Sequence, residues 1–315
     1  MNYRQLGATG LKVSVLSFGA SSLGSVFHPI DEKEGIRAVH EAFINGINYF
    51  DVSPYYGLLK AEHVLGQALL EIPREQIILS TKAGRYGQDH FDFSYERIIR
   101  SVEESMKRLN TDYIDILYLH DIEFGHMDQV INEGIPALHD LKRQGKIRFA
   151  GVSGLPLQVF RTVLSHEHVD VILSYCHYCL NDDSLLELLP LVQEKGVGLV
   201  NASPLSMGLL SGNEPPEWHP AAPVIRNKCL EAYEYCQMKG ISLPKLAIQF
   251  AVQHEQIPTT LVSTAKPDNI KANIAFALEK PDSAAMQEIR ELLSPIQRMS
   301  WPSGRPENDK GVFVR

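Results

Sequence analysis

Short apolar runs alternate with longer amphipathic segments along nearly the whole chain, and this alternation constrains the fold more than any other feature. The apolar runs are almost continuous, which is typical of parallel strands buried on both faces of a sheet. The segments between them repeat their apolar residues with helical spacing. Strands are predicted at residues 15–18, 47–51, 77–81, 113–119, 147–152, 169–173, 198–201 and 260–263, and helices at 32–45, 62–70, 94–109, 128–144, 156–164, 184–195 and 243–253.

Eight strand–helix units over roughly 250 residues predict a (β/α)8 TIM barrel. The alternative is a doubly wound open sheet, which for nucleotide binding should carry G-x-G-x-x-G after its first strand; FGASSLG at residues 18–24 does not match. We find no domain boundary or internal repeat, so residues 1–315 are interpreted as one domain.

Additions to the barrel are expected at both ends of the chain. An N-terminal β-hairpin at residues 3–6 and 11–13 should cover one end of it. An extra C-terminal helix at 282–293 should pack on the outside and be followed by a polar, loosely held C-terminus. Pro136 is expected to kink the helix at 128–144, because proline lacks a backbone N–H.

Composition and charge narrow the class of partner. The formal net charge of -8 offers no basic field for nucleic acid or an acidic membrane surface, so a small-molecule substrate is favoured. No stretch is apolar enough to span a membrane, and MNYRQLG lacks the features of a signal peptide, so we expect a cytoplasmic monomer or weak homodimer. Cys176 and Cys179 form a C-x-x-C, but Cys229 and Cys236 show no ligand-like spacing, so reduced thiols and no metal site are expected.

Polar side chains stand at consecutive strand ends, where a barrel carries its chemistry. The second strand ends in Asp51, with Tyr56 five residues later; the third ends in Lys82, the fourth in His120 and the fifth in Ser153. A structural interpretation of Asp51, as a residue capping a turn, is open when this stretch is taken alone. Taken together, these residues should converge on one pocket.

The four side chains suit proton transfer to and from an oxygen. The phenol of Tyr56 ordinarily titrates near pH 10, and an ammonium within hydrogen-bond reach favours the phenolate. Lys82 can supply that charge, and Asp51 can keep a buried lysine protonated. His120 can orient the substrate oxygen. Such a site suits carbonyl reduction or alcohol oxidation with hydride from a nicotinamide cofactor. A Schiff-base lysine is the alternative, but it leaves Tyr56 and Asp51 without tasks.

These residues carry a resemblance to a known family. The pattern D-x-x-x-x-Y-G, a strand-end Lys, a strand-end His and G-V-S resembles the aldo-keto reductase superfamily, and is met by Asp51, Tyr56, Gly57, Lys82, His120 and 151–153. The stretches DVSPYYG, LHDIEFG, ILSYCHY and WPSG resemble a sugar-oxidising branch of it. The resemblance implies a barrel, a nicotinamide dinucleotide, and NAD-dependent oxidation of an aldose at C1 to the aldonolactone, with L-galactose the favoured sugar.

Three other functions stay open within this resemblance. One is a dehydrogenase for a related aldose such as L-fucose or D-arabinose, and another is a general carbonyl reductase. A third is a non-catalytic, nucleotide-sensing channel β subunit, a class against which the intact site residues argue.

The resemblance also implies where the cofactor binds. Ser153 would contact the nicotinamide amide, with Ser174 near it, although Gly154 and Ser174 replace the family's usual Asn and Gln, and Ala202 its usual Tyr. Ser203 and Leu205 would reach the pyrophosphate. In the late segment LVSTAKPDNIKAN, Ser263 and Asn269 stand where NADP-preferring members have Lys and Arg, so NAD is expected over NADP. Lys266 and Asn273 complete the expected cofactor contacts, with Lys271 a further cation nearby.

Aromatic residues are expected to surround the substrate beside His120. Phe91 and Phe93 after the third strand, and Phe124 after the fourth, would form the pocket wall. Trp218, with His219, lies in a long insertion after the seventh strand and would close over the cofactor or substrate, since long loops at that end of a barrel often form lids.

Overall fold

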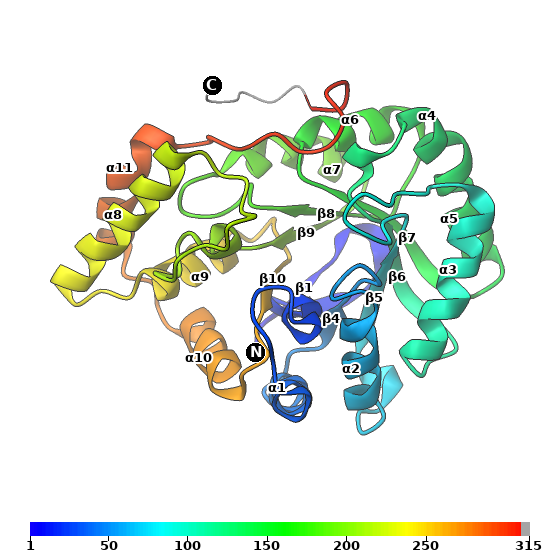
Figure 1. Ribbon diagram of the computed structural model, residues 1–315, viewed down its shortest axis with the longest axis horizontal. Helices are drawn as coiled ribbons and strands as arrows, with labels where there is room; N and C mark the ends of the chain where they lie inside the picture. The colour runs from blue at the N-terminus through cyan, green and yellow to red at the C-terminus, as the bar shows by residue number, and fades with distance from the viewer. Residues whose placement is uncertain (310–315) are drawn as a thin grey trace.

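The computed structural model describes residues 1–309 and places eight parallel strands in one closed barrel (Figure 1). The last strand pairs with both its predecessor and the first, so the ring is complete. In spatial order the strands are β10 (Thr259–Ser263), β3 (Leu16–Gly19), β4 (Tyr49–Asp51), β5 (Ile78–Ala83), β6 (Ile114–Leu119), β7 (Ile147–Gly154), β8 (Val171–Tyr175) and β9 (Gly198–Ala202). The predicted TIM barrel is confirmed, with strand limits shifted by one or two residues at several ends.

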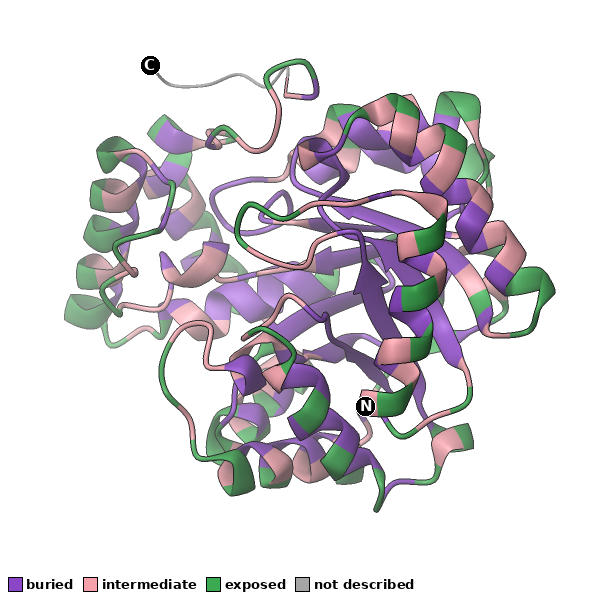
Figure 2. Cartoon of the chain, turned by 45° about the vertical axis from the view of Figure 1, so that its right-hand side comes forward, coloured by how far each residue is buried: buried purple, intermediate pink, exposed green. Residues whose placement is uncertain are grey.

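The strands are apolar because they are buried on both faces. β5 and β6 are buried along their whole length, and in Figure 2 the barrel is a buried layer inside a ring of helices. Tyr49 and Tyr118 belong to the cluster that fills the barrel interior, where their hydroxyls hydrogen-bond each other at 3.0 Å. The interior is therefore packed with side chains, and the space for a ligand lies at a barrel end.

The predicted N-terminal hairpin consists of β1 (Tyr3–Gln5) and β2 (Lys12–Ser14). Leu6 is buried in the same cluster as the barrel interior. Gly7 lies so close to the start of β9 that a Cβ there would be 2.4 Å from the backbone nitrogen of Gly198. The hairpin thus closes the N-terminal end of the barrel, and the strand-end side chains lie at the other end.

Helices surround the barrel with their exposed faces outward (Figure 2). No helix within residues 1–309 is both long enough and apolar enough to cross a membrane. The helices are α1 (Glu32–Ile44), α2 (Lys60–Leu69), α3 (Tyr95–Arg108), α4 (Met127–Gln129), α5 (Ile135–Arg143), α6 (Leu157–His166), α7 (Leu189–Glu194), α8 (Pro223–Lys239), α9 (Leu243–Gln253), α10 (Pro267–Leu278) and α11 (Ser283–Leu293).

Two predicted helices are interrupted near a proline. Residues 128–144 form α4, a π-helical turn at Val130–Gly134 and then α5, with Pro136 in the first turn of α5. The proline thus directly follows the π-helical turn, where the α-helical hydrogen-bond pattern is already interrupted. Residues 184–195 likewise divide into a 3-10 segment, Ser184–Leu188, and α7.

α8 and α10 lie in segments where the sequence pattern predicts no helix. The buried residues of α8 are few and mostly small, namely Ile225, Cys229, Ala232 and Cys236, so its apolar stripe is faint. Its ends carry clearer signals: a proline in the first turn and Gly240 in the left-handed conformation that ends it.

The C-terminal region agrees with expectation only in part. The predicted extra helix is α11, which packs beside α8 (Figure 1). The prediction of a loosely held segment after it is wrong through residue 309, since Trp301 and Asn308 are buried. The amide of Asn308 donates to the carbonyls of Glu123 and Gly125, both at 2.9 Å. Residues 310–315 of the predicted tail lie outside the described residues.

Candidate active site

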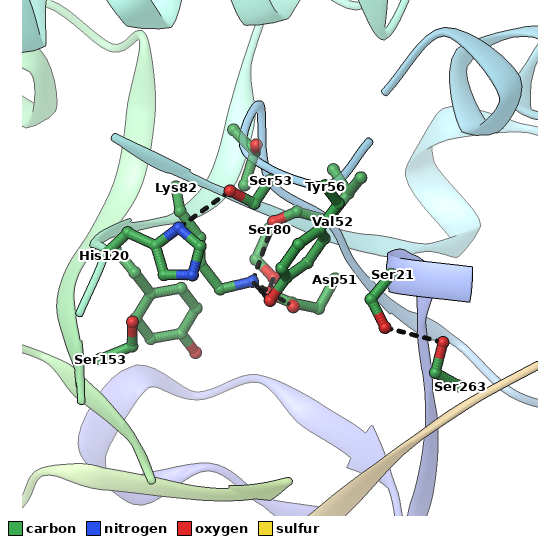
Figure 3. Close-up of polar contacts among 12 residues, drawn as sticks. Ser21, Asp51, Val52, Ser53, Tyr56, Ser80, Lys82, His120, Ser153 and Ser263 are labelled. Carbon is green, nitrogen blue, oxygen red and sulfur yellow. Dashed lines mark hydrogen bonds and ion pairs between the residues drawn. The ribbon is translucent and has the colours of Figure 1, made fainter. Parts of the chain in front are cut away.

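Neighbouring strands bring Asp51, Lys82, His120 and Ser153 together at the C-terminal end of the barrel (Figure 3). Asp51 ends β4, Lys82 precedes the last residue of β5, His120 directly follows β6, and Ser153 precedes the last residue of β7. All four side chains are buried. The parallel register thus converts residues far apart in the sequence into one cluster.

A compact loop after β4 holds Tyr56 over this cluster. The backbone N–H of Tyr56 donates to the Ser53 carbonyl at 3.1 Å. Gly24, which ends the 3-10 helix Ala20–Gly24, touches the same loop: a Cβ on Gly24 would lie 2.6 Å from the Tyr56 carbonyl. Gly57 packs equally closely on Gly24 and has a φ of 61°. The two glycines therefore allow the approach that positions the phenol.

The ammonium of Lys82 is the centre of the cluster. It donates to Asp51 Oδ2 at 2.5 Å, to the Val52 carbonyl at 2.9 Å and to the Tyr56 hydroxyl at 3.2 Å. The Ser80 hydroxyl donates to the other Asp51 oxygen at 2.6 Å. Burial lowers the pKa of Lys82, but the charges and hydrogen bonds of Asp51 and Tyr56 outweigh it, so the net pKa is raised. Lys82 is therefore protonated with three acceptors, which argues against a Schiff-base role.

Burial affects the pKa of Tyr56 more strongly than the charge of Lys82 does. Burial raises the pKa of Tyr56, and the Lys82 charge opposes that rise without cancelling it. The expected direction of the lysine effect is thus present, while the net pKa lies above the usual value. At neutral pH the phenol is protonated, and Lys82 stabilises the phenolate that forms when the proton leaves.

His120 faces Tyr56 as a neutral imidazole. The two rings are perpendicular, with centroids 5.6 Å apart. Burial lowers the pKa of His120 well below its usual value, and the charges of Lys82 and Arg85 lower it further. Nδ1 is hydrogen-bonded to the Ser53 hydroxyl at 2.9 Å, and that hydroxyl accepts the Tyr55 N–H at 3.1 Å. Ser53 can then donate to Nδ1, which leaves the proton of the ring on Nε2.

An ion pair that the sequence reasoning missed lies beside His120. Arg85 Nη1 donates to Asp121 Oδ2 at 2.5 Å, and that oxygen is 3.6 Å from His120 Nε2. The Arg85 guanidinium lies over the Tyr55 ring at 3.8 Å. The sequence carried two signals of this ion pair. Asp121 directly follows His120 at a strand end, and Arg85 comes three residues after Lys82.

Four predicted nicotinamide and pyrophosphate contacts lie on β7, β8 and the loop after β9. Ser153 Oγ accepts the backbone N–H of Asp121 at 3.3 Å. Ser174 Oγ is buried and has no hydrogen-bond partner within residues 1–309. Ser203 adopts a left-handed conformation with a φ of 58°, and Leu205 packs partly buried against the core. The unpartnered hydroxyl of Ser174 fits a polar ligand group such as a carboxamide.

The predicted adenosine contacts lie on β10 and α10. The Ser263 hydroxyl is already bonded to the 3-10 helix Ala20–Gly24 that follows β3. It accepts from Ser21 Oγ at 2.9 Å (Figure 3). It also accepts from the Ser22 N–H at 2.9 Å. Lys266 and Asn269 are exposed at the start of α10, and Asn273 is half-buried one turn later; Lys271 pairs with Glu41 of α1 at 3.3 Å.

Two of the three aromatic residues predicted to form the substrate wall lie together. Phe91 and Phe124 stack with centroids 4.6 Å apart and an interplanar angle of 2°, close to Arg85. The expectation for Phe93 is wrong: it is buried, and its ring fills the space beside Gly84 and Gly125, where a Cβ on either would clash with it. Phe93 therefore supports the loops from beneath.

Trp218 is 52% exposed, and its ring lies 6.0 Å from that of Phe27 in the loop before α1. His219 is buried, 5.1 Å from the ring of Trp301. The insertion after β9 is thus tied to two other segments by aromatic contacts. Closure of this segment over a ligand stays a prediction.

The four cysteines are free and buried. Within residues 1–309, no group of three or more His, Cys, Asp or Glu side chains is placed to hold a metal ion.

Glu123, just beyond β6, is a fully buried carboxyl that joins the strand ends to the C-terminal segment. Its Oε1 accepts from the Leu155 N–H at 3.1 Å and from the Ser303 hydroxyl at 2.9 Å. A Cβ on Gly154 would be 2.7 Å from Oε2, so the glycine leaves room for the carboxyl. Burial raises the pKa of Glu123 to about 8, and the Asp121 carboxyl adds to the rise.

Stability should therefore fall as Glu123 ionises. Its folded pKa exceeds the unfolded value of ~4.3, so the folded state binds more protons between the two, and the stabilisation is lost as the pH rises through about 8. Glu123→Gln is neutral throughout. Its free energy of unfolding relative to wild type should rise by more than ~1 kcal/mol between about pH 5 and about pH 9. Urea unfolding at both pH values checks this; parallel pH dependences would contradict it.

The chain matches the Aldo/keto reductase family over residues 15–294. It is 48% identical over 314 residues to L-galactose dehydrogenase from Arabidopsis thaliana, covering 97% of this chain and 98% of that protein. It is 34% identical over 257 residues to D-arabinose 1-dehydrogenase from Saccharomyces cerevisiae, covering 76% of this chain and 75% of that protein. A solved aldo-keto reductase from Bacillus halodurans, in its holo form, superposes with a TM-score of 0.78 at 31% identity, covering 98% of this chain and 100% of that one.

The matched region begins immediately before β3 and ends at residue 294, immediately after α11, so it includes every barrel strand and each strand end that contributes to the site. Members of this family use nicotinamide cofactors. On this evidence the chain belongs to the aldo/keto reductase family and is an oxidoreductase of that family.

Proposed function

We propose that this protein is an NAD-dependent aldose 1-dehydrogenase that oxidises L-galactose, or a closely related aldose, at C1 to the aldonolactone. The observation that carries the proposal is the Lys82 ammonium, held between Asp51 and the Tyr56 hydroxyl beside a neutral His120. Support for the sugar comes from the similarity to L-galactose dehydrogenase over nearly the full length of both chains.

In this proposal Tyr56 moves the proton. During oxidation the base is the phenolate form of Tyr56, which has released its own proton to solvent and is stabilised by the neighbouring Lys82 ammonium; it takes the proton of the C1 hydroxyl and becomes the neutral phenol again. Asp51 keeps Lys82 protonated in a buried setting. His120 donates from Nε2 to the substrate oxygen and so orients it toward Tyr56. The nicotinamide cofactor, when bound, supplies the hydride acceptor.

Two serines would hold the nicotinamide end of the cofactor. Ser153 lies one strand from His120, and the buried hydroxyl of Ser174 lacks a partner among the described residues. Both occupy the ends of adjacent strands, since Gly154 and Ser174 are register partners of β7 and β8. Ser203 and Leu205, beyond β9, would lie along the pyrophosphate.

Steady-state oxidation of an aldose panel with NAD and with NADP tests the proposal. L-galactose with NAD should give the highest kcat/KM, and the product should be the lactone. Higher kcat/KM for L-fucose or D-arabinose would assign a related aldose, and reduction of simple aldehydes without sugar oxidation would assign a carbonyl reductase. NAD binding with no turnover on any of them would contradict an enzymatic function.

The preference for NAD rests on the charges around the predicted adenosine site. Ser263 and Asn269 are uncharged, and the Ser263 hydroxyl is already bonded to the loop after β3. Lys271 is paired with Glu41, and Asp268 adds a negative charge to the first turn of α10. A 2′-phosphate would thus find few cations there.

Introducing two cations at these positions should shift the cofactor preference toward NADP. Ser263→Lys combined with Asn269→Arg should raise kcat/KM for NADP relative to NAD by roughly 10- to 100-fold, because each charge-assisted hydrogen bond to a phosphate contributes on the order of 1.5–3 kcal/mol before desolvation. The ratio of the two kcat/KM values measures the effect. Lys266→Gln in the same background provides the comparison, and an unchanged ratio would mean that the 2′ position is read elsewhere.

A further inference from the structure

The Arg85–Asp121 ion pair has no task in the proton transfer proposed above, yet it lies within reach of the substrate. Asp121 Oδ2 is 3.6 Å from His120 Nε2, the ring nitrogen that faces away from Ser53. A substrate oxygen held by His120 would therefore bring the atoms next to it close to this carboxylate. Asp121 is buried and 15% of the Arg85 side chain is exposed, although the pair stands at a barrel end.

The guanidinium has hydrogen-bonding capacity that the protein does not use. Arginine carries five N–H donors in a fixed fork. Nη1 of Arg85 binds Asp121, while Nε is buried and finds no acceptor within residues 1–309. A buried donor without a partner costs free energy, so such a group beside the strand-end cluster indicates a ligand that satisfies it.

Aromatic rings surround the pair and form an apolar platform next to it. The guanidinium lies 3.8 Å over the Tyr55 ring, with Phe91 and Phe124 at 5.2 and 5.3 Å. All three rings are only partly buried. A surface that combines flat apolar rings with a few fixed polar groups fits a ligand with C–H faces and hydroxyl edges.

The backbone holds these groups rigidly. Arg85 and Phe91 form an antiparallel bridge across the loop after β5, and Asp121 occupies the left-handed region with a φ of 51°. The N–H of Asp121 is bonded to Ser153 Oγ. A non-glycine residue held in this conformation is strained, and such strain is common at ligand sites.

We propose that Arg85 and Asp121 form a hydroxyl-binding subsite that recognises a vicinal diol of the substrate and so selects sugars over simple carbonyl compounds. Arg85 donates a hydrogen bond to one hydroxyl oxygen, Asp121 accepts a hydrogen bond from the neighbouring hydroxyl, and the carbon skeleton packs on Phe91 and Phe124. This inference rests on the proposed function. It assigns the enzyme's specificity for sugars to residues other than those that transfer the proton.

The test compares a sugar with a substrate that has no hydroxyls. Arg85→Met should reduce kcat/KM for L-galactose oxidation by roughly 10²-fold or more, mainly through KM, while reduction of butanal stays within about threefold of wild type. Asp121→Asn should act in the same direction. NAD affinity, measured by quenching of protein fluorescence, should be unchanged in both variants, which also shows that they fold.

Monodeoxy analogues of the sugar sharpen the result. Removing one hydroxyl of the recognised diol should weaken the wild-type enzyme strongly but the Arg85→Met variant little, because the partner of that hydroxyl is already absent. Arg148→Gln is the matched control: it breaks an Arg–Asp pair at the start of β6 and β7, and Asp115 keeps its second partner, Arg74. Its sugar kinetics should equal those of wild type.

The possible outcomes distinguish a failure of the proposed subsite from a failure of the proposed function. Equal losses on sugar and butanal, or unchanged sugar kinetics in both variants, would overturn the subsite while leaving a sugar dehydrogenase in place. Calorimetry of sugar binding to the wild-type protein with NADH tells these two failures apart, because it measures binding without turnover. A wild-type protein that neither binds nor oxidises any aldose would contradict both.

Discussion

Tyr56→Phe should lower kcat for sugar oxidation by roughly 10²–10⁴-fold, because it removes the phenol oxygen that accepts the proton in its ionised form and leaves the rest of the site in place. The Lys82 ammonium keeps two of its three acceptors, Asp51 and the Val52 carbonyl, so the cluster should stay folded. NAD affinity should change little, since the phenol contributes to the chemical step. Single-turnover rates and a fluorescence titration with NAD provide the two measurements.

Tyr55→Phe is the matched comparison. It removes the hydroxyl of the adjacent tyrosine but keeps the ring that lies over Arg85. Its loss in kcat should be less than about tenfold, because this hydroxyl takes no proton in the proposed reaction. If Tyr56→Phe retained a near-wild-type rate, or if both variants lost the same factor, the assignment of proton transfer to Tyr56 would be wrong.

Asp51→Asn should produce the second large effect, on both stability and rate. Lys82 has only 2% of its side chain exposed, and removal of its carboxylate leaves a buried ammonium without a counter-charge. Breaking a buried pair in this way destabilises proteins by about 3–5 kcal/mol. Burial then lowers the pKa of Lys82, so the amine becomes neutral more readily and Tyr56 loses the charge that favours its phenolate.

The pH dependence of stability in Asp51→Asn follows from the protonation of Lys82. In Asp51→Asn the folded state binds fewer protons than the unfolded state once the pKa of Lys82 falls below its unfolded value, so stability should rise with pH. Urea unfolding across the neutral and alkaline range measures this. The double variant Asp51→Asn/Lys82→Met should regain stability without regaining activity, since it removes both charges.

A control at the opposite end of the barrel separates stability from chemistry. Asp115 is also fully buried, and it pairs with Arg74 and Arg148. Asp115→Asn should destabilise the protein while leaving kcat near wild type, because this carboxylate lies far from the reacting groups along β6. If Asp51→Asn lost stability but kept its kcat, Asp51 would be a purely structural residue.

Most of the fold was predictable because it follows from local patterns. Near-continuous apolar strands and amphipathic helices repeat along the chain, so eight strands and a barrel could be inferred without tertiary information. The order of Asp51, Lys82 and His120 at strand ends was predictable for the same reason, since parallel strands carry their C-terminal ends to one edge. α8 escaped prediction because its buried stripe consists mainly of small residues.

Other features depend on contacts between distant segments, which no local pattern reports. Glu123 becomes an anchor only because Leu155 and Ser303, one of them 180 residues away, donate to it. Phe93 and Phe91 are two residues apart, yet one fills the core beside Gly84 and the other stacks on Phe124.

The sequence by itself thus determined the barrel, its eight strands and the residue types at their ends, because hydrophobic spacing and strand direction are local properties of the chain. Only the tertiary structure decided which of these residues are protonated and which form ion pairs. Tyr56 stays protonated because burial outweighs Lys82, and Arg85 reaches Asp121 across two strand ends. Desolvation and long-range pairing set these outcomes, and both depend on what surrounds a side chain after folding.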